Sequence, residues 1–258
     1  MSLGIASRYS PGKYFDYCSS RAQSHIYFNR VETYLQPSGA SSSIVNSDDF
    51  SYEYEKDALL SAINKYGWSW ILAVSVGSED LYRGDSNVSS LVTQINDVRG
   101  MLKSTPSYPT SGIKVGHVDT SNIWTETSTY PLTRACDFVG VDSYPYFQAT
   151  QNNSISNAGN LFREGIAGVK TAVSKAGSTA SVWVAETGWP VNGSTKGLAV
   201  AGRENARAYW SDVACSSFDT EVGEGGVNIW WFTLQDWSAY PSFAVVDPEF
   251  EVEYDLSC

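Results

Sequence analysis

The sequence has little histidine and few basic side chains. Only two of the 258 residues are histidine, and 17 Lys and Arg stand against 28 Asp and Glu, which gives a net charge of −11. His25 and His117 leave few ways to build a histidine zinc site or a Ser-His-Asp triad. The negative charge repels polyanions, so nucleic acid and anionic membranes are not expected as partners. A neutral ligand fits this composition better.

Motifs for nucleotide, metal and redox chemistry are also missing. There is no Gly-x-Gly-x-x-Gly or Walker pattern, and the four cysteines show no Cys-x-x-Cys spacing. We therefore expect neither a cofactor nor a metal. No apolar run approaches membrane-spanning length, so no membrane insertion is expected. Residues 1–20 lack the apolar core of a signal peptide; if the protein is exported, its signal is missing from this sequence.

Aromatic residues, by contrast, are abundant. The chain has nine Trp and 16 Tyr, enough to supply both a core and a binding surface. Its length suits one large domain, and α/β barrels commonly have this size. Asn-x-Ser sequons at Asn87, Asn152 and Asn192 suit a secreted glycoprotein, although such triplets also arise by chance.

Helical and strand patterns alternate from Ser51 onward. Runs of β-branched and aromatic residues predict buried strands, and apolar residues at helical spacing predict helices between them. This alternation is typical of a parallel sheet, and strands with polar carboxyl ends suit a (β/α) barrel better than an open sheet. The expected helices cover 51–65, 89–103, 130–135, 158–175 and 203–217, and the expected strands cover 68–77, 113–118, 137–141, 181–185 and 226–232.

The first 48 residues differ from the rest of the chain. They show no sustained hydrophobic period, and 26–31 is at most one short strand. We therefore expect an irregular N-terminal segment at 1–48 and a (β/α) barrel domain at 49–258.

Carboxylates follow the expected strands. In a barrel, active groups collect at the carboxyl ends of the strands, where the βα loops converge. Glu79 and Glu186 each follow an apolar strand with room for three βα units between them, so we expect them on opposite sides of one cleft. Structural caps or rim salt bridges are the alternative. The full set of such carboxylates is Glu79, Asp119, Asp142, Glu186 and Asp236.

Two facing carboxylates with exposed aromatic rings are what glycoside hydrolysis requires. One acid protonates the leaving oxygen, the other carboxylate attacks or activates water, and flat rings hold the faces of the sugar. The sequence therefore favours a glycosidase.

Five motifs resemble glycoside hydrolase family 17, most closely its fungal cell-wall endo-β-1,3-glucanases and related glucanosyltransferases. The resemblance covers the chain from about Asp49, and it implies a (β/α)8 barrel that acts on β-glucan with retention of configuration. The first three strands of that barrel are not recognisable here. The motifs are Val76-Gly-Ser-Glu-Asp-Leu-Tyr-Arg83, Gly116-His-Val-Asp-Thr120, Phe138-Val-Gly-Val-Asp-Ser-Tyr-Pro-Tyr-Phe147, Glu186-Thr-Gly-Trp-Pro190 and Trp231-Phe-Thr-Leu-Gln-Asp236.

The resemblance also implies roles for individual residues. Glu186 matches the nucleophile of the family, Glu79 its acid/base, and Tyr144 a tyrosine placed to donate a hydrogen bond to the nucleophile. A retaining mechanism needs the two carboxyl groups only ~5 Å apart. Cys215 and Cys258 match cysteines of some members, which implies a disulfide between the last helix and the tail.

Further side chains are implied to contact substrate. Ser78 stands where plant members have Asn. Its side chain reaches less far, so the hydrogen bond that the family makes to a substrate hydroxyl is expected to have less reach or to be absent. Asp119 lies in a matching motif, with a less defined role. Trp189, Trp231 and Phe232 are candidates for stacking against sugar rings, and core packing is the alternative for each.

The resemblance thus predicts a secreted or cell-wall enzyme with β-glucan as its partner. Two alternatives stay open. A β-1,3-glucanosyltransferase shares both carboxylates and differs in whether sugar or water reaches the glycosyl-enzyme. A catalytically silent β-glucan-binding protein is the other, because the first 48 residues depart from the family.

Overall fold

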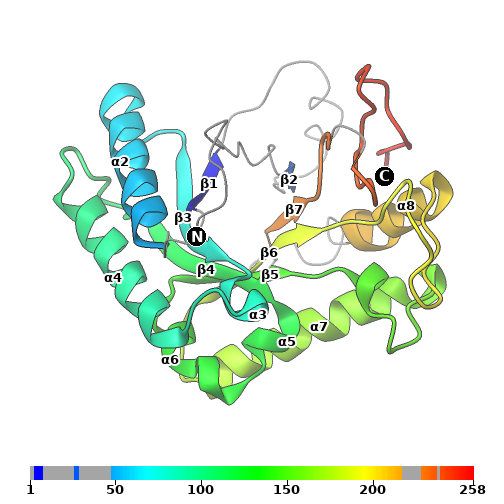
Figure 1. Ribbon diagram of the computed structural model, residues 1–258, viewed down its shortest axis with the longest axis horizontal. Helices are drawn as coiled ribbons and strands as arrows, with labels where there is room; N and C mark the ends of the chain where they lie inside the picture. The colour runs from blue at the N-terminus through cyan, green and yellow to red at the C-terminus, as the bar shows by residue number, and fades with distance from the viewer. Residues whose placement is uncertain (1–2, 8–25, 29–47, 217–227, 237–238) are drawn as a thin grey trace, which may run out of the picture. The chain divides into compact units, whose positions relative to one another are not determined.

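Parallel strands alternating with helices make up the described part of the chain. The computed structural model describes residues 3–7, 26–28, 48–216, 228–236 and 239–258 (Figure 1). Contacts divide the chain into two units, the first with 1–9, 32–140 and 172–181, and the second with 10–31, 141–171 and 182–258.

The first unit has a four-strand order of β1-β3-β4-β5. β3 (Ile71–Ser78) and β4 (Lys114–Thr120) are parallel, with Ala73 opposite Lys114, whereas β1 (Leu3–Ser7) is antiparallel to β3. β5 (Phe138–Asp142) ends in the second unit. The helices are α2 (Asp48–Tyr66), α3 (Asp80–Arg83), α4 (Val88–Ser104), α5 (Ser121–Trp124) and α6 (Tyr130–Ala135).

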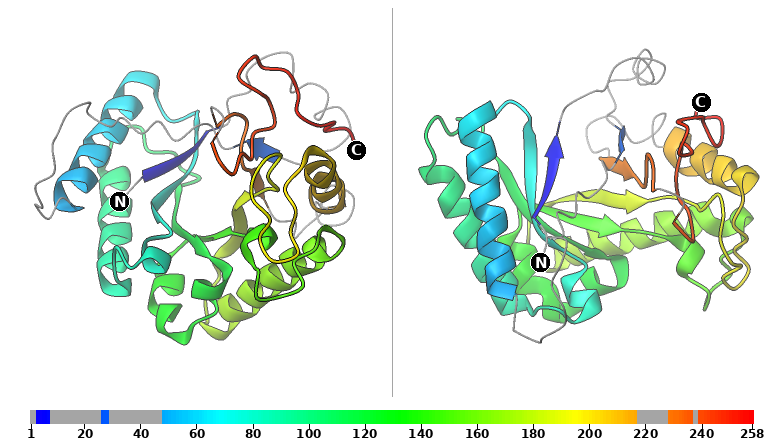
Figure 2. Two further views of the ribbon diagram at one scale, coloured as in Figure 1. Left: turned by 45° about the vertical axis from the view of Figure 1, so that its right-hand side comes forward. Right: turned by 45° about the horizontal axis from the view of Figure 1, so that its top comes forward.

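The sequence of α4 explains its place beside the strands. Asn87 caps its first turn by accepting a hydrogen bond from Ser90 N at 3.0 Å. α2 lies alongside α4 (Figures 1 and 2), where the Lys56 ammonium contacts the Asp97 carboxylate at 2.6 Å. The face of α4 that turns inward repeats every three or four residues and is fully buried: Leu91, Ile95, Val98 and Leu102.

The second unit contains the neighbouring strands β6, β7 and β2, in that order. β6 (Ser181–Thr187) and β7 (Ile229–Trp231) are parallel, and β7 is parallel to β2 (Ile26–Phe28). α7 (Ile155–Lys175) lies along β6 (Figure 2). α8 (Arg203–Tyr209) continues into a π-helical segment, Trp210–Cys215. Aromatic rings fill the core here, with the centroids of Trp210 and Trp231 4.9 Å apart.

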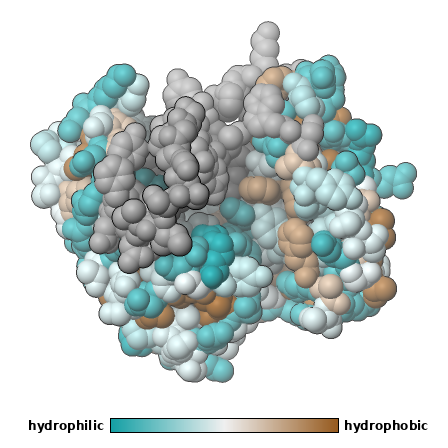
Figure 3. Space-filling view, viewed as in Figure 1, coloured by the Kyte–Doolittle hydropathy of each residue, from teal (hydrophilic) through white to brown (hydrophobic). Residues whose placement is uncertain are grey.

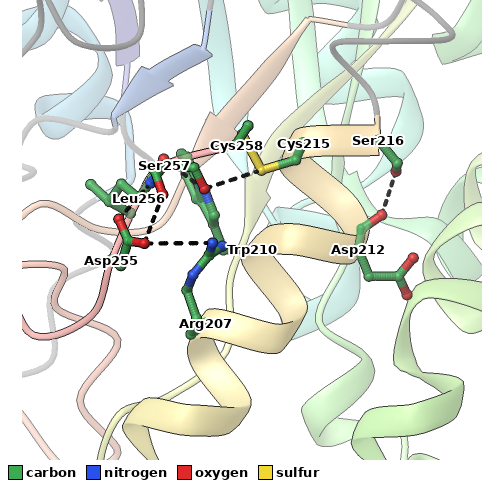
Figure 4. Close-up of a disulfide and its surroundings, with 9 residues drawn as sticks. All are labelled: Arg207, Trp210, Asp212, Cys215, Ser216, Asp255, Leu256, Ser257 and Cys258. Atoms are coloured by element: carbon green, nitrogen blue, oxygen red, sulfur yellow. Dashed lines mark hydrogen bonds and ion pairs between the residues drawn. A yellow bond between two sulfur atoms is a disulfide. The ribbon is translucent and has the colours of Figure 1, made fainter.

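A disulfide between Cys215 and Cys258 fastens the C-terminal tail to this helical segment (Figure 4). The tail also accepts a hydrogen bond from Trp210 Nε1 at the carbonyl of Leu256, 3.0 Å away. The Arg207 guanidinium lies 3.7 Å from the Asp255 carboxylate. The disulfide implied by the family resemblance is therefore present.

The expected elements are largely confirmed, with differences at several places. The strand expected in 26–31 is observed at Ile26–Phe28, and residues 29–31 lie outside the described part. The helix expected at 203–217 changes to π geometry after Tyr209. The antiparallel strand β1 was not predicted, because its five residues lie in the segment that shows no hydrophobic period. Most of 1–48 is outside the described residues, so the expected domain boundary stays a prediction.

Among the described helices, none combines the length and apolar character needed to cross a membrane. On the face shown in Figure 3, hydrophilic and apolar residues are interspersed.

Candidate active site

Glu186 lies near the carboxyl end of β6, as the sequence predicts. Trp183 and Val184, which favour strand geometry, bury their side chains in β6, and Glu186 itself is half-buried. The Tyr144 hydroxyl donates a hydrogen bond to Glu186 Oε2 at 2.7 Å. A donor at this distance stabilises the ionised carboxylate, which is the form that a nucleophile needs.

Tyr144 belongs to an aromatic cluster formed by Tyr144, Phe147, Phe232 and Phe243. Its ring centroid lies 6.0 Å from those of Phe147 and Phe232 and 5.4 Å from that of Phe243. Phe243 is buried, Phe232 is half-buried, and Phe147 is 48% exposed. The cluster therefore offers an apolar surface beside Glu186. Phe147 was missed as a candidate, although it closes one of the quoted motifs.

Trp189 and Trp231 lie in the core of the second unit. Both side chains are fully buried. Trp189 Nε1 donates to the carbonyl of Val200 at 2.9 Å, and Trp231 Nε1 donates to the Tyr254 hydroxyl at 2.9 Å. Since neither ring has an exposed face, the structure supports the packing alternative for both residues.

Glu79 directly follows β3 and begins α3. Its backbone has a φ of 55°, a left-handed conformation that is uncommon for residues other than glycine. The N–H of Glu79 donates to the carbonyl of Val118 at 2.9 Å, which ties the turn to β4. The side chain is 26% exposed, and Arg83 Nη1 lies 3.5 Å from Glu79 Oε2. The turn thus presents a partly exposed carboxylate beside a cation.

Glycine is required immediately before this turn. Gly77 has a φ of 80°, and a Cβ atom built on it would lie 2.0 Å from Asp80 Oδ2. The carbonyl of Ser78 accepts a hydrogen bond from Arg83 Nη2, and the Ser78 side chain is half-buried. Arg83 therefore contacts the turn at two points. Sequence reasoning gave Arg83 no role, although it lies one helical turn after Glu79.

The buried residues Asp119 and His117 support the turn that carries Glu79. Asp119 is fully buried; its Oδ2 accepts from Leu81 N at 3.0 Å and its Oδ1 from Thr120 N at 2.8 Å. His117 is also fully buried, with Nε2 3.2 Å from Asp119 Oδ2 and Nδ1 2.7 Å from the carbonyl of Val76. The carboxylate of Asp119 is thus used within the chain.

Asp80 lies beside this group and is 1% exposed. Burial raises the pKa of the Asp80 carboxyl, and the nearby His117 opposes that shift. The sequence alone allows His117 either to line a cleft or to serve as a core histidine. Its buried position and two hydrogen-bond partners support the second interpretation.

The other strand-end carboxylates, Asp236 and Asp142, lie in hydrogen-bonded or buried positions. Asp236 accepts from Phe243 N at 2.8 Å and from Ser242 Oγ at 3.1 Å, so it ties its own loop together. Asp142 is buried at the end of β5. Within the described residues, no group of three or more His, Cys, Asp or Glu side chains is arranged to hold a metal ion.

The two principal carboxylates belong to different units. Glu79 lies in the first unit and Glu186 in the second. Their expected opposition across one cleft therefore stays a prediction.

The family model of the BtgE/BtgC glycoside hydrolase domain matches residues 27–245. The chain belongs to this family. The resemblance to glycoside hydrolase family 17 found in the five motifs is thereby confirmed, and the match begins upstream of Asp49.

Curated fungal proteins resemble this BtgE/BtgC domain. It is 41% identical over 223 residues to the probable glucan endo-1,3-β-glucosidase eglC of Aspergillus oryzae, covering 79% of this chain and 45% of the relative. It is 29% identical over 220 residues to the glucan 1,3-β-glucosidase of Schizosaccharomyces pombe, covering 82% of this chain and 65% of the relative. The chain spans about half the length of the Aspergillus relatives it matches.

Solved structures show the fold of the domain. The glycoside hydrolase family 17 β-1,3-glucanosyltransferase from Rhizomucor miehei matches with a TM-score of 0.66 at 23% identity, over 81% of this chain and 73% of that one. CJP38, a β-1,3-glucanase and allergen of Cryptomeria japonica pollen, matches with a TM-score of 0.65 at 18% identity, over 82% and 81%. The expected fold class, a (β/α)8 barrel that is incomplete or irregular at its N-terminus, is confirmed.

Proposed function

We propose that this BtgE/BtgC domain hydrolyses β-1,3-glucosidic bonds in β-glucan with retention of anomeric configuration. The observation that carries the proposal is the Tyr144–Glu186 hydrogen bond of 2.7 Å at a strand end. It prepares one carboxylate for attack inside a domain of a glycoside hydrolase family. The name glucan endo-1,3-β-glucosidase borne by the Aspergillus relatives supports the substrate class.

In this proposal Glu186 is the nucleophile and Glu79 the acid/base. Glu186 attacks the anomeric carbon while Glu79 gives its proton to the leaving oxygen, and a covalent glycosyl-enzyme forms. Glu79 then takes a proton from water as the water attacks that intermediate. The mechanism requires the carboxyl groups to approach within ~5 Å. Tyr144 keeps Glu186 ionised before attack, since its hydroxyl is a donor.

We assign the substrate contacts to the aromatic cluster. Phe147 is exposed and Phe232 half-buried, and Tyr144 contacts both rings as well as Glu186. Such rings pack against the apolar face of a glucose unit. Ser78, next to Glu79, is the candidate for a hydrogen bond to the sugar. Trp189, Trp231 and Asp119 support the site from the interior, as their burial favours.

Substitution of Glu186 tests the function. Glu186→Gln keeps the size of the side chain but removes the nucleophile, so we expect laminarin hydrolysis to fall by about 10⁴-fold or more while binding persists. Glu164→Gln, an exposed change on α7, is the matched control and should leave the rate unchanged. Retained turnover in Glu186→Gln would remove the assignment.

Product analysis in the same assay separates the two alternatives. Laminari-oligosaccharides longer than the added substrate would indicate a glucanosyltransferase. Saturable glucan binding without release of reducing sugar would indicate a silent binding protein. Hydrolysis products alone are expected here.

We further propose a secreted or cell-wall location. Disulfides persist in oxidising compartments, and Cys215 is joined to Cys258. Asn87, Asn152 and Asn192 of the three sequons are all exposed. Peptide mass mapping of the protein from its native host, before and after N-glycosidase treatment, should reveal glycan on at least Asn152. Three unmodified sequons together with free thiols at both cysteines would contradict this location.

A further inference from the structure

The residue after the proposed nucleophile makes an unusual set of contacts. Thr187 is fully buried at the end of β6. Its Oγ1 lies 2.7 Å from the carbonyl oxygen of Ser143 and 2.9 Å from the Tyr209 hydroxyl. Its own carbonyl accepts a hydrogen bond from Phe232 N at 2.8 Å. One residue thus binds the segments that follow β5 and β7 and the end of α8.

The direction of these hydrogen bonds follows from chemistry. A carbonyl oxygen only accepts, so the single hydroxyl proton of Thr187 goes to Ser143. Tyr209 must therefore donate to Thr187 Oγ1. Burial raises the pKa of Tyr209, which keeps its hydroxyl protonated and able to donate. The Tyr209 ring is held by its neighbours, with centroids 5.7 Å from Trp189 and 5.6 Å from Trp231.

Ser143 connects Thr187 to the segment that contains Glu186 and Tyr144. Its N–H donates to the carbonyl of Glu186 at 2.9 Å, while its own carbonyl accepts from Thr187. The peptide groups on both sides of Ser143 are therefore fixed to the 186–187 segment. Tyr144 comes next in the chain and returns a hydrogen bond to Glu186 Oε2. The contacts form a closed ring of four residues: Ser143, Tyr144, Glu186 and Thr187.

We propose that Thr187 is a positioning residue, which holds Tyr144 in hydrogen-bonding reach of Glu186 and is itself oriented by Tyr209. The proposal rests on the function proposed above. Without the Thr187 hydroxyl, the Ser143 carbonyl loses its buried donor and the loop that carries Tyr144 is fixed by one contact fewer.

Three variants test the role of the hydroxyl. Thr187→Val keeps the shape and removes the hydroxyl, so we expect kcat for laminarin to fall by about tenfold, with KM changed by less than about threefold. Thr187→Ser restores the hydroxyl and should recover most of kcat. Tyr209→Phe removes only the orienting donor and should have a smaller effect than Thr187→Val. Equal kcat in Thr187→Val and the wild type would overturn the proposal, as would equal losses in Thr187→Val and Thr187→Ser.

A double-mutant cycle distinguishes positioning from general loss of stability. If Thr187 acts through Tyr144, Thr187→Val should add almost nothing to the loss caused by Tyr144→Phe. Additive losses would show that Thr187 acts by another route.

A spectroscopic measurement makes the test independent of turnover. The ¹³Cζ resonance of Tyr144, assigned by its disappearance in Tyr144→Phe, reports the hydrogen bond to the carboxylate. It should shift in Thr187→Val and stay in place in Thr187→Ser; an unmoved resonance in Thr187→Val contradicts the proposal even for an inactive chain. Persistence of hydrolysis in Glu186→Gln would instead contradict the proposed function, so the two failures are distinguishable.

Discussion

At the residue scale, the candidate site depends on carboxylates that differ in their surroundings. Glu186 accepts from a phenol, whereas Glu79 lies near a guanidinium on a turn in the left-handed conformation. Asp119 is a third type, enclosed and bound by backbone donors and His117. Similar residues at strand ends therefore carry different roles, and burial decides between them.

The role of Asp119 leads to a stability prediction. Asp119→Ala leaves the N–H of Leu81 and the buried His117 ring without their acceptor. A buried donor left without its acceptor typically costs about 1–3 kcal/mol, so we expect the free energy of unfolding to fall by at least that amount. Urea denaturation followed by tryptophan fluorescence measures it.

Asp85→Ala is the matched control for that experiment. Asp85 is an exposed partner of Arg83, 2.8 Å from its Nε, and its removal should cost no more than about 1 kcal/mol. If Asp119→Ala were as mild as the control, Asp119 would not be a structural support of the Glu79 turn.

Sequence motifs point to Glu79, Glu186 and Tyr144 as candidates, because each stands in a recognisable run beside a strand. They gave no role to Thr187, although it lies in the Glu186 motif. Its hydroxyl partners, Ser143 and Tyr209, are 44 and 22 residues away in the chain. Only the folded backbone brings these partners together, so local pattern cannot reveal the link. The same holds for the pairing of His117 with the carbonyl of Val76.

At the element scale, the helices and strands from residue 48 onward follow the hydrophobic period closely. α4 is the clearest case, since its four fully buried side chains are those that the spacing places on one face. Boundaries were harder to predict. The strand expected at 226–232 is described only as Ile229–Trp231, and the helix after Arg203 loses α geometry at Trp210. Tertiary contacts fix such ends, and the sequence pattern alone does not contain them.

The helical segment Trp210–Cys215 and the tail depend on their disulfide. Cys215 and Cys258 are 43 residues apart. In the chain-entropy model, a disulfide that closes a loop of this length stabilises the fold by about 4 kcal/mol, because it restricts the unfolded chain. We expect Cys258→Ser to lower the melting temperature of the domain substantially. The buried Cys136 forms no disulfide in the described structure, so Cys136→Ser should not mimic the effect.

Calorimetry in the presence and absence of dithiothreitol checks this prediction. The reductant should lower the melting temperature of the wild type to that of Cys258→Ser and leave the variant itself unchanged. If full reduction of the disulfide left the wild-type melting temperature unchanged, the tail would be held by its hydrogen bonds and ion pairs alone.

At the scale of the whole molecule, the fold class and the family are established, whereas the N-terminal part departs from a regular barrel. A first strand that is antiparallel to its neighbour is not a feature of a (β/α)8 barrel, in which all strands are parallel. The sequence indicated this departure through the missing period of residues 1–48. It gave no sign of the direction in which β1 pairs.

The central claim is that Glu186 forms the covalent bond to the sugar. Incubation with a 2-deoxy-2-fluoro-β-laminaribiosyl fluoride, followed by peptide mass mapping, tests it most directly. The 2-fluorine slows both formation and breakdown of the glycosyl-enzyme, and the good fluoride leaving group keeps formation fast enough for the intermediate to accumulate. We predict one adduct of the fluorinated disaccharide on the peptide that contains Glu186, and none on Glu186→Gln. An adduct on another carboxylate, or turnover to an inverted product without any adduct, would contradict the account.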